Sequence, residues 1–239
     1  MQNVFKRYEE KYLVSKERGA ELREIISRRM EKDTFGEYLV QNLYFDTANR
    51  DVIRCSLEKP LYKEKMRLRC YDIPDKESRV FLELKKKYDG IVYKRRIAIP
   101  YSALTFRSVQ SVVAEETSQV ARELDFYMKT NNVFESVYIA YRRTAFASAE
   151  CDGLRVTFDT DIRFRTERLD YLHPDCGNTA LARDKIVMEI KTPGGMPLWM
   201  SRLLSEKNIF PASFSKYGVC YSGCIAKRRE TETKEKLSA

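Results

Sequence analysis

The chain has 239 residues, of which 43% are hydrophobic and 33% are charged, and this composition is typical of a globular protein. Its length allows one large domain with a sizeable core. No apolar run approaches the roughly 20 residues that a membrane-spanning helix needs. Because charged residues follow the N-terminus closely, a signal peptide is excluded, and we expect a cytosolic protein.

The net charge of +9 is unevenly distributed along the chain. Between Lys63 and Arg96 there are 12 Lys and Arg residues against 6 Asp and Glu residues. A local excess of positive charge attracts phosphates, whether they belong to nucleotides, nucleic acid, polyphosphate or anionic lipid. This segment is therefore the first candidate for an anion-binding surface.

The sequence offers little for a metal site built from Cys or His. None of the 6 cysteines forms a C-x-x-C pair, and the single histidine, His173, precedes a proline in a predicted loop. Zinc binding and catalysis by a histidine base are therefore disfavoured. Any metal is expected to be held by carboxylates, which favours Mg²⁺ or Mn²⁺.

Strand patterns dominate the predicted secondary structure. The first two predicted strands, Phe5–Val14 and Tyr38–Asp46, flank a helix whose N-cap is Ser15. The sequence then predicts a three-stranded meander, a helical block, three more strands and a last helix: Leu61–Tyr71, Arg79–Lys87, Ile91–Pro100, Tyr101–Asn131, Ser136–Ala147, Leu154–Arg163, Lys185–Lys191 and Pro197–Lys207.

These elements predict an α+β fold with a single domain over residues 1–225. Roughly eight mostly antiparallel strands are expected to form a β-barrel, with helices that flank it and plug it, and such a barrel can hold a small ligand. The remaining residues, 226–239, are expected to be a charged, disordered tail.

The segment K-E-K-M-R-L-R places a cation at every second position from Lys63 to Arg69. Alternate side chains of a strand point to opposite faces, so these cations share one face. The alternation recurs in other predicted strands, with Glu83, Lys85 and Lys87; Tyr141 and Arg143; Arg155, Thr157 and Asp159; and Glu189 and Lys191. One charged face normally meets water, but its repetition predicts a closed sheet with a charged interior suited to a polyanion. Lys63 and Lys87 lie near strand ends, where a plain surface position is the alternative.

Nine motifs along the chain stand in the order found in one known family. They are R-Y-E-E-K-Y-L-V (Arg7–Val14), L-Y-F-D-T (Leu43–Thr47), Y-K-E-K-M-R-L-R-C-Y (Tyr62–Tyr71), F-L-E-L-K-K-K (Phe81–Lys87), I-V-Y-K-R-R (Ile91–Arg96), Y-R-R-T-A-F (Tyr141–Phe146), L-R-V-T-F-D-T (Leu154–Thr160), V-M-E-I-K (Val187–Lys191) and F-S-K-Y (Phe214–Tyr217). From about Val4 to Ser222 the chain resembles a VTC domain of the stand-alone bacterial type. VTC domains are the polyphosphate polymerase branch of the triphosphate tunnel metalloenzymes, a CYTH-like superfamily.

The resemblance implies an eight-stranded antiparallel tunnel that binds ATP with Mn²⁺ or Mg²⁺. It implies transfer of the terminal phosphoryl group of ATP to a growing polyphosphate chain. The candidate catalytic residues are Arg67, Arg69, Lys85, Arg143, Arg155 and Lys216, and the candidate substrate-binding residues are Lys11, Lys65, Lys94, Tyr141 and Ser215. Glu189 matches the metal-binding carboxylate, and Glu9 and Glu83 are further candidates. A role for Glu83 as an ion-pair partner of neighbouring lysines is the alternative.

The chain departs from the wider superfamily at one position of its opening motif. That motif is E-x-E-x-K, and Arg7 stands here in place of the first acid. This substitution is typical of the VTC branch, removes one acid from the metal cluster and argues against a thiamine-triphosphatase-like or adenylyl-cyclase-like member. Ser213 stands where the eukaryotic polymerases look more basic.

Other functions stay open at this point. The same tunnel suits a hydrolase of tripolyphosphate or nucleoside triphosphates, or a non-catalytic module that binds polyphosphate or inositol phosphates. Nucleic acid is the least expected partner, because its binding proteins usually interleave exposed aromatics with cations on an open face. The SPX-like and transmembrane segments of the eukaryotic polymerases have no counterpart in this sequence, so any membrane coupling is expected to need a separate protein.

Overall fold

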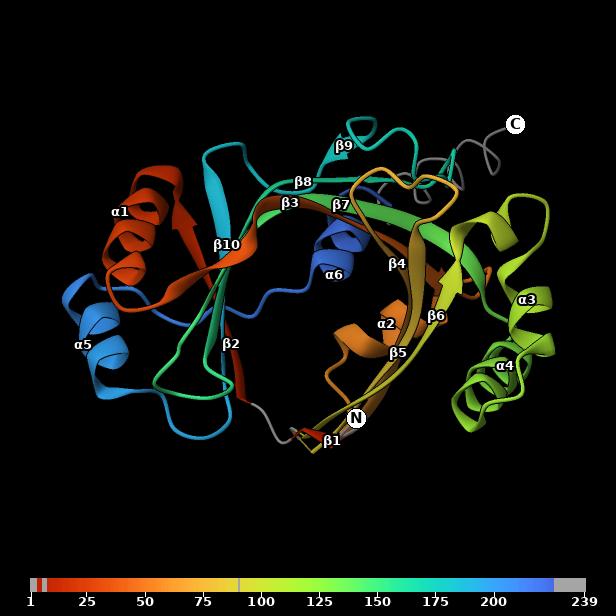
Figure 1. Ribbon diagram of the computed structural model, residues 1–239, viewed down its shortest axis with the longest axis horizontal. Helices are drawn as coiled ribbons and strands as arrows, with labels where there is room; N and C mark the ends of the chain where they lie inside the picture. The colour runs from red at the N-terminus through yellow and green to blue at the C-terminus, as the bar shows by residue number, and fades with distance from the viewer. Residues whose placement is uncertain (1–3, 6–7, 90, 226–239) are drawn as a thin grey trace, which may run out of the picture.

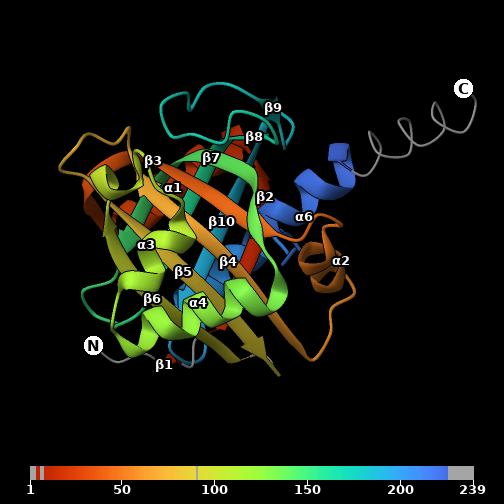
Figure 2. The same ribbon diagram turned by 90° about the vertical axis from the view of Figure 1, so that its right-hand side faces the viewer.

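The computed structural model describes residues 4–5, 8–89 and 91–225. A strongly curved antiparallel sheet surrounds a central space, and helices lie outside it and at one end (Figures 1 and 2). The strands follow one another in the order β1-β6-β5-β4-β3-β7-β8-β10-β2, and the short β9 pairs with β8. The expected α+β class with an antiparallel barrel-like sheet is confirmed.

The bounds of the elements are close to those expected. The strands are β1 (Val4–Phe5), β2 (Tyr8–Ser15), β3 (Glu31–Asp46), β4 (Tyr62–Tyr71), β5 (Arg79–Tyr88), β6 (Ile91–Pro100), β7 (Phe134–Ala147), β8 (Arg155–Arg165), β9 (Asn178–Thr179) and β10 (Lys185–Thr192). The α-helices are α1 (Lys16–Ser27), α2 (Asp51–Leu57), α3 (Val109–Glu115), α4 (Gln119–Asn131), α5 (Leu198–Glu206) and α6 (Lys216–Cys220). A 3₁₀ turn, Tyr101–Leu104, follows β6, and a π turn, Tyr221–Ile225, follows α6.

The N-terminal segment contacts both edges of the sheet. β1 pairs with β6, whereas β2 pairs with β10 along its whole length. The prediction of one continuous strand, Phe5–Val14, is therefore wrong, because its two parts pair with opposite edges. Among the described residues no strand pairing joins β2 directly to β6, so hydrogen bonds do not close the sheet between these strands.

β3 is longer than the sequence indicates. It begins at Glu31 and is 16 residues long, whereas the predicted strand begins at Tyr38. The added part contains Glu, Lys, Asp and Gly, which are depleted in strands. The pairing of β3 with β7 shifts between Lys32 and Glu37, and Gly36 adopts a φ of 66° there. Such an irregularity breaks the alternation on which strand prediction depends.

Two hydrophobic layers cover the outside of the sheet. One packs α3 and α4 against β4 and β5, and the other packs α1 and α5 against β2, β8 and β10 (Figure 1). Met66 and Leu68 on β4, and Leu82 and Leu84 on β5, are completely or almost completely buried in the first layer. Since these residues face outward, the alternating cations of the same strands are directed inward.

A third apolar cluster fills part of one end of the central space. Ile53 of α2 and Tyr217 of α6 pack against Val137 and Ile139, which lie on the inner face of β7. The expectation of plugging helices is thus confirmed. No helix in the described part of the chain combines the length and apolarity needed to cross a bilayer. The predicted disordered tail, residues 226–239, lies outside the described residues.

Asp46 fixes the start of α2 against this plug. Its buried carboxylate accepts hydrogen bonds from the backbone N–H groups of Thr47, Val52 and Ile53 at 2.8, 2.9 and 3.1 Å. The Tyr217 hydroxyl donates a fourth at 2.7 Å. The carboxylate therefore satisfies orphan donors at a helix start and joins that helix to α6.

We expect Asp46→Ala to lower the free energy of unfolding by about 3 kcal/mol, because several buried donors lose their partner at once. Tyr217→Phe removes only one of these bonds and is expected to cost about 1 kcal/mol. Urea unfolding followed by circular dichroism measures both. Equal losses in the two variants would contradict the helix-start role of Asp46.

Candidate functional site

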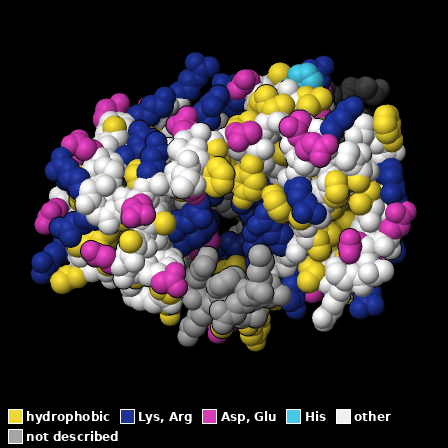
Figure 3. Space-filling model, in the orientation of Figure 1, with side chains coloured by type: hydrophobic (Ala, Val, Ile, Leu, Met, Phe, Trp, Pro, Cys, Tyr) yellow, Lys and Arg dark blue, Asp and Glu magenta, His cyan; other side chains and the backbone are white. Residues whose placement is uncertain are grey.

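The candidate residues converge on the central space from most of the strands. Figure 3 shows a hollow in this face of the molecule with Lys and Arg side chains on both sides of it. Across the meander, Lys65, Lys85 and Lys94 stand opposite one another on β4, β5 and β6. Three ammonium groups on neighbouring strands repel one another, so the interior must supply counter-charges or bind an anion.

Glu83 is the counter-charge for the cations of the meander. Lys94 Nζ lies 2.6 Å from one carboxylate oxygen and Arg67 Nη2 lies 2.8 Å from the other. Arg96 and Arg69 lie farther away, at 3.7 and 4.0 Å. Burial alone would raise the pKa of Glu83, but the cations outweigh it and hold that pKa well below its usual range. This arrangement favours the ion-pair alternative for Glu83 over metal binding.

Asp159 is a second interior counter-charge, and our candidate list from the sequence omits it. The carboxylate is fully buried and accepts two hydrogen bonds from Arg143, at 2.7 and 2.8 Å. Lys216 Nζ, at the start of α6, lies 2.5 Å from the same group. Burial raises the pKa of Asp159, but Arg143 and Lys216 lower it more. The only signal for Asp159 in the sequence was its place in the alternation with Arg155 and Thr157.

Tyr141 lies among the same cations. Arg69 Nη2 donates to its hydroxyl at 3.4 Å, and Lys216 Nζ lies 4.5 Å from the centre of its ring. Burial raises the pKa of the Tyr141 hydroxyl, but Arg143, Arg69 and Lys216 together lower it to about 8. The site therefore stabilises negative charge at this hydroxyl, as it would on a phosphate oxygen.

Glu9 and Glu189 form an acid pair on the adjacent strands β2 and β10. Glu189 stands opposite Lys11, and Glu9 stands opposite Lys191. Lys191 contacts Glu189 at 2.7 Å, whereas Lys11 and Lys85 contact Glu9 at 3.1 and 3.2 Å. Burial raises the pKa of both carboxyls, but the lysines outweigh it, so both pKa values lie well below the usual range. Lys191 also lies outside our candidate list, although it shares a strand face with Glu189.

A lysine-lined cavity of about 580 Å³ opens at the end of the tunnel near α2. Its lining includes Lys11, Lys59, Lys63, Lys65, Lys85 and Lys87, together with the acids Glu9 and Asp89 and the segment 212–215 that precedes α6. Lys63 and Lys87 thus border the cavity, in addition to lying near strand ends. The excess of ammonium groups over carboxylates suits a polyanion.

Lys65 lines this cavity, and its surroundings destabilise its positive charge. Among the described residues its ammonium contacts the Ser215 hydroxyl at 3.3 Å and pairs with no carboxylate. Burial, and then the nearby Lys63 and Lys11, lower the pKa of Lys65 to about 7. Ser215 also begins α6 by accepting a hydrogen bond from Gly218 N at 3.2 Å. A phosphate near Lys65 would supply the missing negative charge.

Arg155 lies apart from these clusters. Its exposed guanidinium contacts Asp33 at 2.9 Å and the Tyr38 hydroxyl at 3.4 Å. Arg155 therefore lies beside the first half of β3, at one end of the tunnel. Apart from Lys65, the structure brings the other predicted cations together around three sets of acids, Glu83, Asp159 and the Glu9–Glu189 pair.

We expect Asp159→Asn to lower the free energy of unfolding by about 3–5 kcal/mol, because two buried cations lose their shared counter-charge. Asp161→Asn is a matched control on β8, since its exposed contact to Arg163 contributes at most about 1 kcal/mol. Tripolyphosphate should then raise the melting temperature of Asp159→Asn more than that of the wild type, because it replaces the lost charge. Equal stability of the two variants would contradict this account.

We expect tripolyphosphate binding at pH 8 to take up a proton at Lys65. At that pH its amine is mostly neutral in the free protein, and a bound anion favours the charged form. Calorimetric titration in two buffers of different ionisation enthalpy measures the uptake, and Lys65→Arg should reduce it by up to about one proton. In the free protein, Lys65 binds fewer protons in the folded state than in the unfolded chain between about pH 7 and pH 10. The free energy of unfolding should therefore rise with pH over this range. Equal proton uptake in wild type and Lys65→Arg would refute the assignment.

The comparisons with known proteins agree with this geometry. The model of the VTC domain family matches residues 6–224. Two solved structures share the fold. One is an adenylate cyclase-like protein from Vibrio parahaemolyticus, with a TM-score of 0.51 and 14% identity over 92% of this chain and 99% of that one. The other is the adenylyl cyclase-like protein HpAC1 from Hippeastrum, described as having a dominant triphosphatase activity, with a TM-score of 0.53 and 19% identity over 90% and 95% of the two chains.

No curated protein matches the sequence. The family match nevertheless spans nearly all the residues from which the tunnel is built, and the two solved structures share its fold. The chain therefore belongs to the VTC domain family and has the fold of the triphosphate tunnel proteins.

Proposed function

We propose that this protein is a polyphosphate polymerase that transfers the terminal phosphoryl group of ATP to a polyphosphate chain. Family membership and the tunnel fold support an enzyme directed at polyphosphate or a triphosphate. The observation that most supports polymerase activity is the lysine-lined cavity, because it shares Lys11, Lys65 and Lys85 with the tunnel interior. The two spaces together offer cations to two polyanions, a donor and an acceptor.

The donor triphosphate would bind to the cations around Asp159 and Glu83. Arg143 and Arg69 present planar guanidinium groups that can hold two phosphate oxygens each, whereas Lys216 and Lys94 act as point charges. All four already converge on interior acids, so their side chains are positioned before the ligand arrives. Positioning and charge neutralisation supply most of the catalysis in phosphoryl transfer.

The acid pair Glu9 and Glu189 fits a hard divalent cation. Their oxygens are the donors that Mg²⁺ and Mn²⁺ prefer, and Mg²⁺ usually uses one or two carboxylates together with substrate phosphates. The described residues contain no cluster of three or more Asp, Glu, His or Cys side chains that would hold a metal alone. Metal binding is thus expected to require the triphosphate. When bound, the metal would neutralise charge on the phosphate oxygens.

The transfer step needs no nucleophile from the protein. A terminal oxygen of the acceptor chain forms a bond to the γ-phosphorus of ATP, and the bond from that phosphorus to the β–γ bridging oxygen breaks. ADP leaves with the bridging oxygen and its electron pair, while the chain grows by one phosphate. Arg67, Lys85 and Arg143 would stabilise the charge that spreads over the transferred group.

The test is incubation of the purified protein with ATP and Mn²⁺, with products resolved on a polyphosphate gel and free phosphate measured in the same tube. We expect long chains from the wild type and none from Glu189→Ala. Arg143→Met should lower the rate by about 10²–10³-fold, because one set of charged donors is lost. Arg142→Met is the matched control, since Arg142 is the exposed neighbour on β7.

Each result has one interpretation. Chains that form equally well in Glu189→Ala and Arg143→Met would refute the proposed site. Free phosphate without chains would make the protein a triphosphatase that uses water as the acceptor in the same tunnel. Neither product, with tight polyphosphate binding, would make it a binding module.

A further inference from the structure

Lysines face one another in pairs along one wall of the lysine-lined cavity. In the pairing of β4 with β5, Lys63 stands opposite Lys87, and Lys65 stands opposite Lys85. All four border the cavity, as does Lys11 of β2. Like charges that stand directly opposite one another in a sheet repel and destabilise it. The wall therefore favours any change that removes a positive charge or adds a negative one.

The acids of the cavity leave Lys65 without a counter-charge. Two of the described residues that line the cavity are acids, Glu9 and Asp89. Glu9 is already held by two other lysines at 3.1 and 3.2 Å, and Asp89 lies exposed in the turn between β5 and β6. In the described part of the chain, the hydrogen-bond partner of the Lys65 amine is the Ser215 hydroxyl at 3.3 Å. A negative group formed on Lys65 itself would be surrounded by ammonium groups.

The Lys65 amine is reachable and mostly neutral at pH 8. Its side chain is only partly buried and borders a space of about 580 Å³. Burial, and then Lys63 and Lys11, lower the pKa of the amine to about 7. A lysine whose positive charge is destabilised by burial and by neighbouring cations is an activated nucleophile. Lys94 also has a lowered pKa, but it lies 2.6 Å from the Glu83 carboxylate, which would repel a new negative charge.

We propose that Lys65 is a carbamate site, whose amine takes up dissolved carbon dioxide and whose carbamate anion is stabilised by the lysines around it. The amine nitrogen forms a bond to the carbon of CO₂, one C–O π bond opens, and its electron pair remains on oxygen. The nitrogen then releases one proton to solvent. The anion is flanked by Lys63, Lys11 and Lys85, and the Ser215 hydroxyl beside the amine is a further donor.

The charge of the cavity favours this reaction over other modifications of a lysine. Carbon dioxide is small and neutral, so a positive field does not exclude it. Acylation of the amine would leave a neutral amide, which gains no attraction from the surrounding ammonium groups. A carbamate gains that attraction, because it places a negative charge where the described acids place none within contact of Lys65.

A carbamate at Lys65 opposes the polyanion of the proposed function. It puts a negative charge into the cavity that we assign to polyphosphate. A bound polyanion in turn favours the protonated amine, which does not react with CO₂. Each ligand therefore weakens the other by the same factor. The carbamate itself does not depend on the proposed function, and only this competition rests on it.

The first experiment detects the carbamate directly. Wild-type protein is equilibrated with ¹³C-bicarbonate at pH 8, the carbamate carbon is observed by NMR, and trapping by alkylation with mapping by mass spectrometry locates it. The α-amino group also has a pKa near 8, so the assignment rests on the difference between wild type and Lys65→Arg. We expect one carbamate per chain that is absent from Lys65→Arg, because a guanidinium stays protonated. Lys63→Gln keeps the amine but removes a neighbouring charge, and should lower the carbamate signal.

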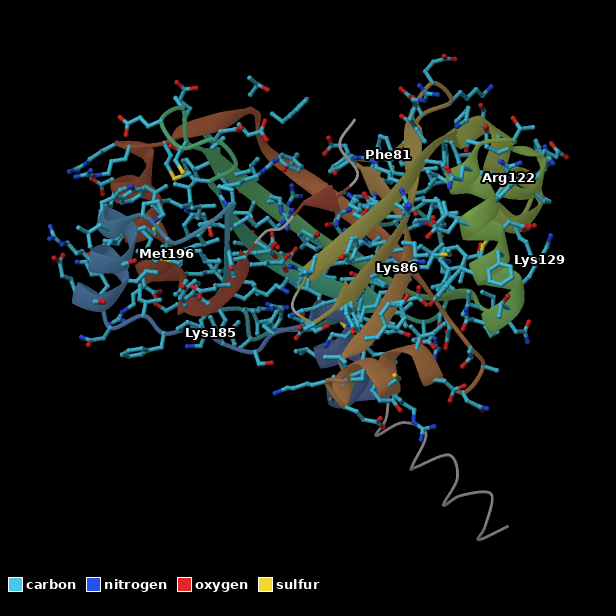
Figure 4. All side chains as sticks on the ribbon, turned by 90° about the horizontal axis from the view of Figure 1, so that it is seen from below. Phe81, Lys86, Arg122, Lys129, Lys185 and Met196 are labelled. Carbon is cyan, nitrogen blue, oxygen red and sulfur yellow. The ribbon has the colours of Figure 1, made fainter. Side chains whose placement is uncertain are left out.

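Lys86→Arg is the matched control from the opposite face of β5. The Lys86 ammonium lies 2.7 Å from Glu123 of α4, and this carboxylate contributes to raising the pKa of Lys86. Figure 4 shows Lys86 on the side of the molecule where Arg122 and Lys129 of α4 lie. The control variant should keep the full carbamate signal. Melting temperatures report whether each variant is folded.

The second experiment measures the competition. Dissociation constants of tripolyphosphate are determined by calorimetry in CO₂-free buffer and in bicarbonate, with nitrate at the same concentration as the control for a small anion in the cavity. Bicarbonate should weaken binding to the wild type by about tenfold relative to nitrate, because a negative charge lies beside the ligand. In Lys65→Arg the two anions should agree within about twofold.

Each outcome decides one part of the inference. No Lys65-dependent carbamate in the wild type overturns it, and so does a signal that is lost from Lys86→Arg. A signal that rises in Lys63→Gln contradicts stabilisation by the lysines. A carbamate at Lys65 that leaves tripolyphosphate binding unchanged supports the site and overturns the competition. A carbamate at Lys65 in a protein that does not bind tripolyphosphate refutes the proposed function and leaves the carbamate site standing.

Discussion

The structure depends on one electrostatic constraint: many cations point into a space enclosed by the sheet, where they are partly removed from water. Each interior carboxylate forms ion pairs with several of these cations. Glu83 contacts Arg67 and Lys94, and Asp159 contacts Arg143 and Lys216. Removing charged groups from water is costly unless partners of opposite sign are near. The acids therefore make the cationic interior compatible with a folded chain that has no ligand.

The same constraint fixes the register of the sheet. On β4, Met66 and Leu68 are buried in the outer layer while Arg67 and Arg69 face inward. A shift of one residue would bring arginines into the hydrophobic layer and leucine into the tunnel. Both changes would raise the free energy of the folded state. The hydrophobic layers outside and the ion pairs inside therefore specify the same strand pairing. Specification from both faces explains how a strand this rich in charge forms a defined part of the fold.

The proposed function depends on the cations that the acids of the described residues leave without an ion-pair partner. Lys65 has a hydroxyl neighbour rather than a carboxylate, and the cavity beside it holds more ammonium groups than acids. In the proposed function, an anion that enters would gain charge interactions that the free protein lacks.

The sequence by itself determined the strand meander and the faces of its cations, because side chains alternate between the two faces of every strand. It also indicated the family, through the order of its motifs. It also placed Ser15 at the start of α1, where its hydroxyl accepts from Arg18 N at 3.3 Å. Only the tertiary structure decided which acids meet which cations. Asp159 and Lys191 were visible in the alternation, but their importance arises from Arg143 and Glu189, and the partners of Asp159 include Lys216, 57 residues away along the chain. The pairing of β1 and β2 with opposite edges of the sheet was likewise decided by the tertiary structure, since pairing between distant strands leaves no local pattern in the sequence.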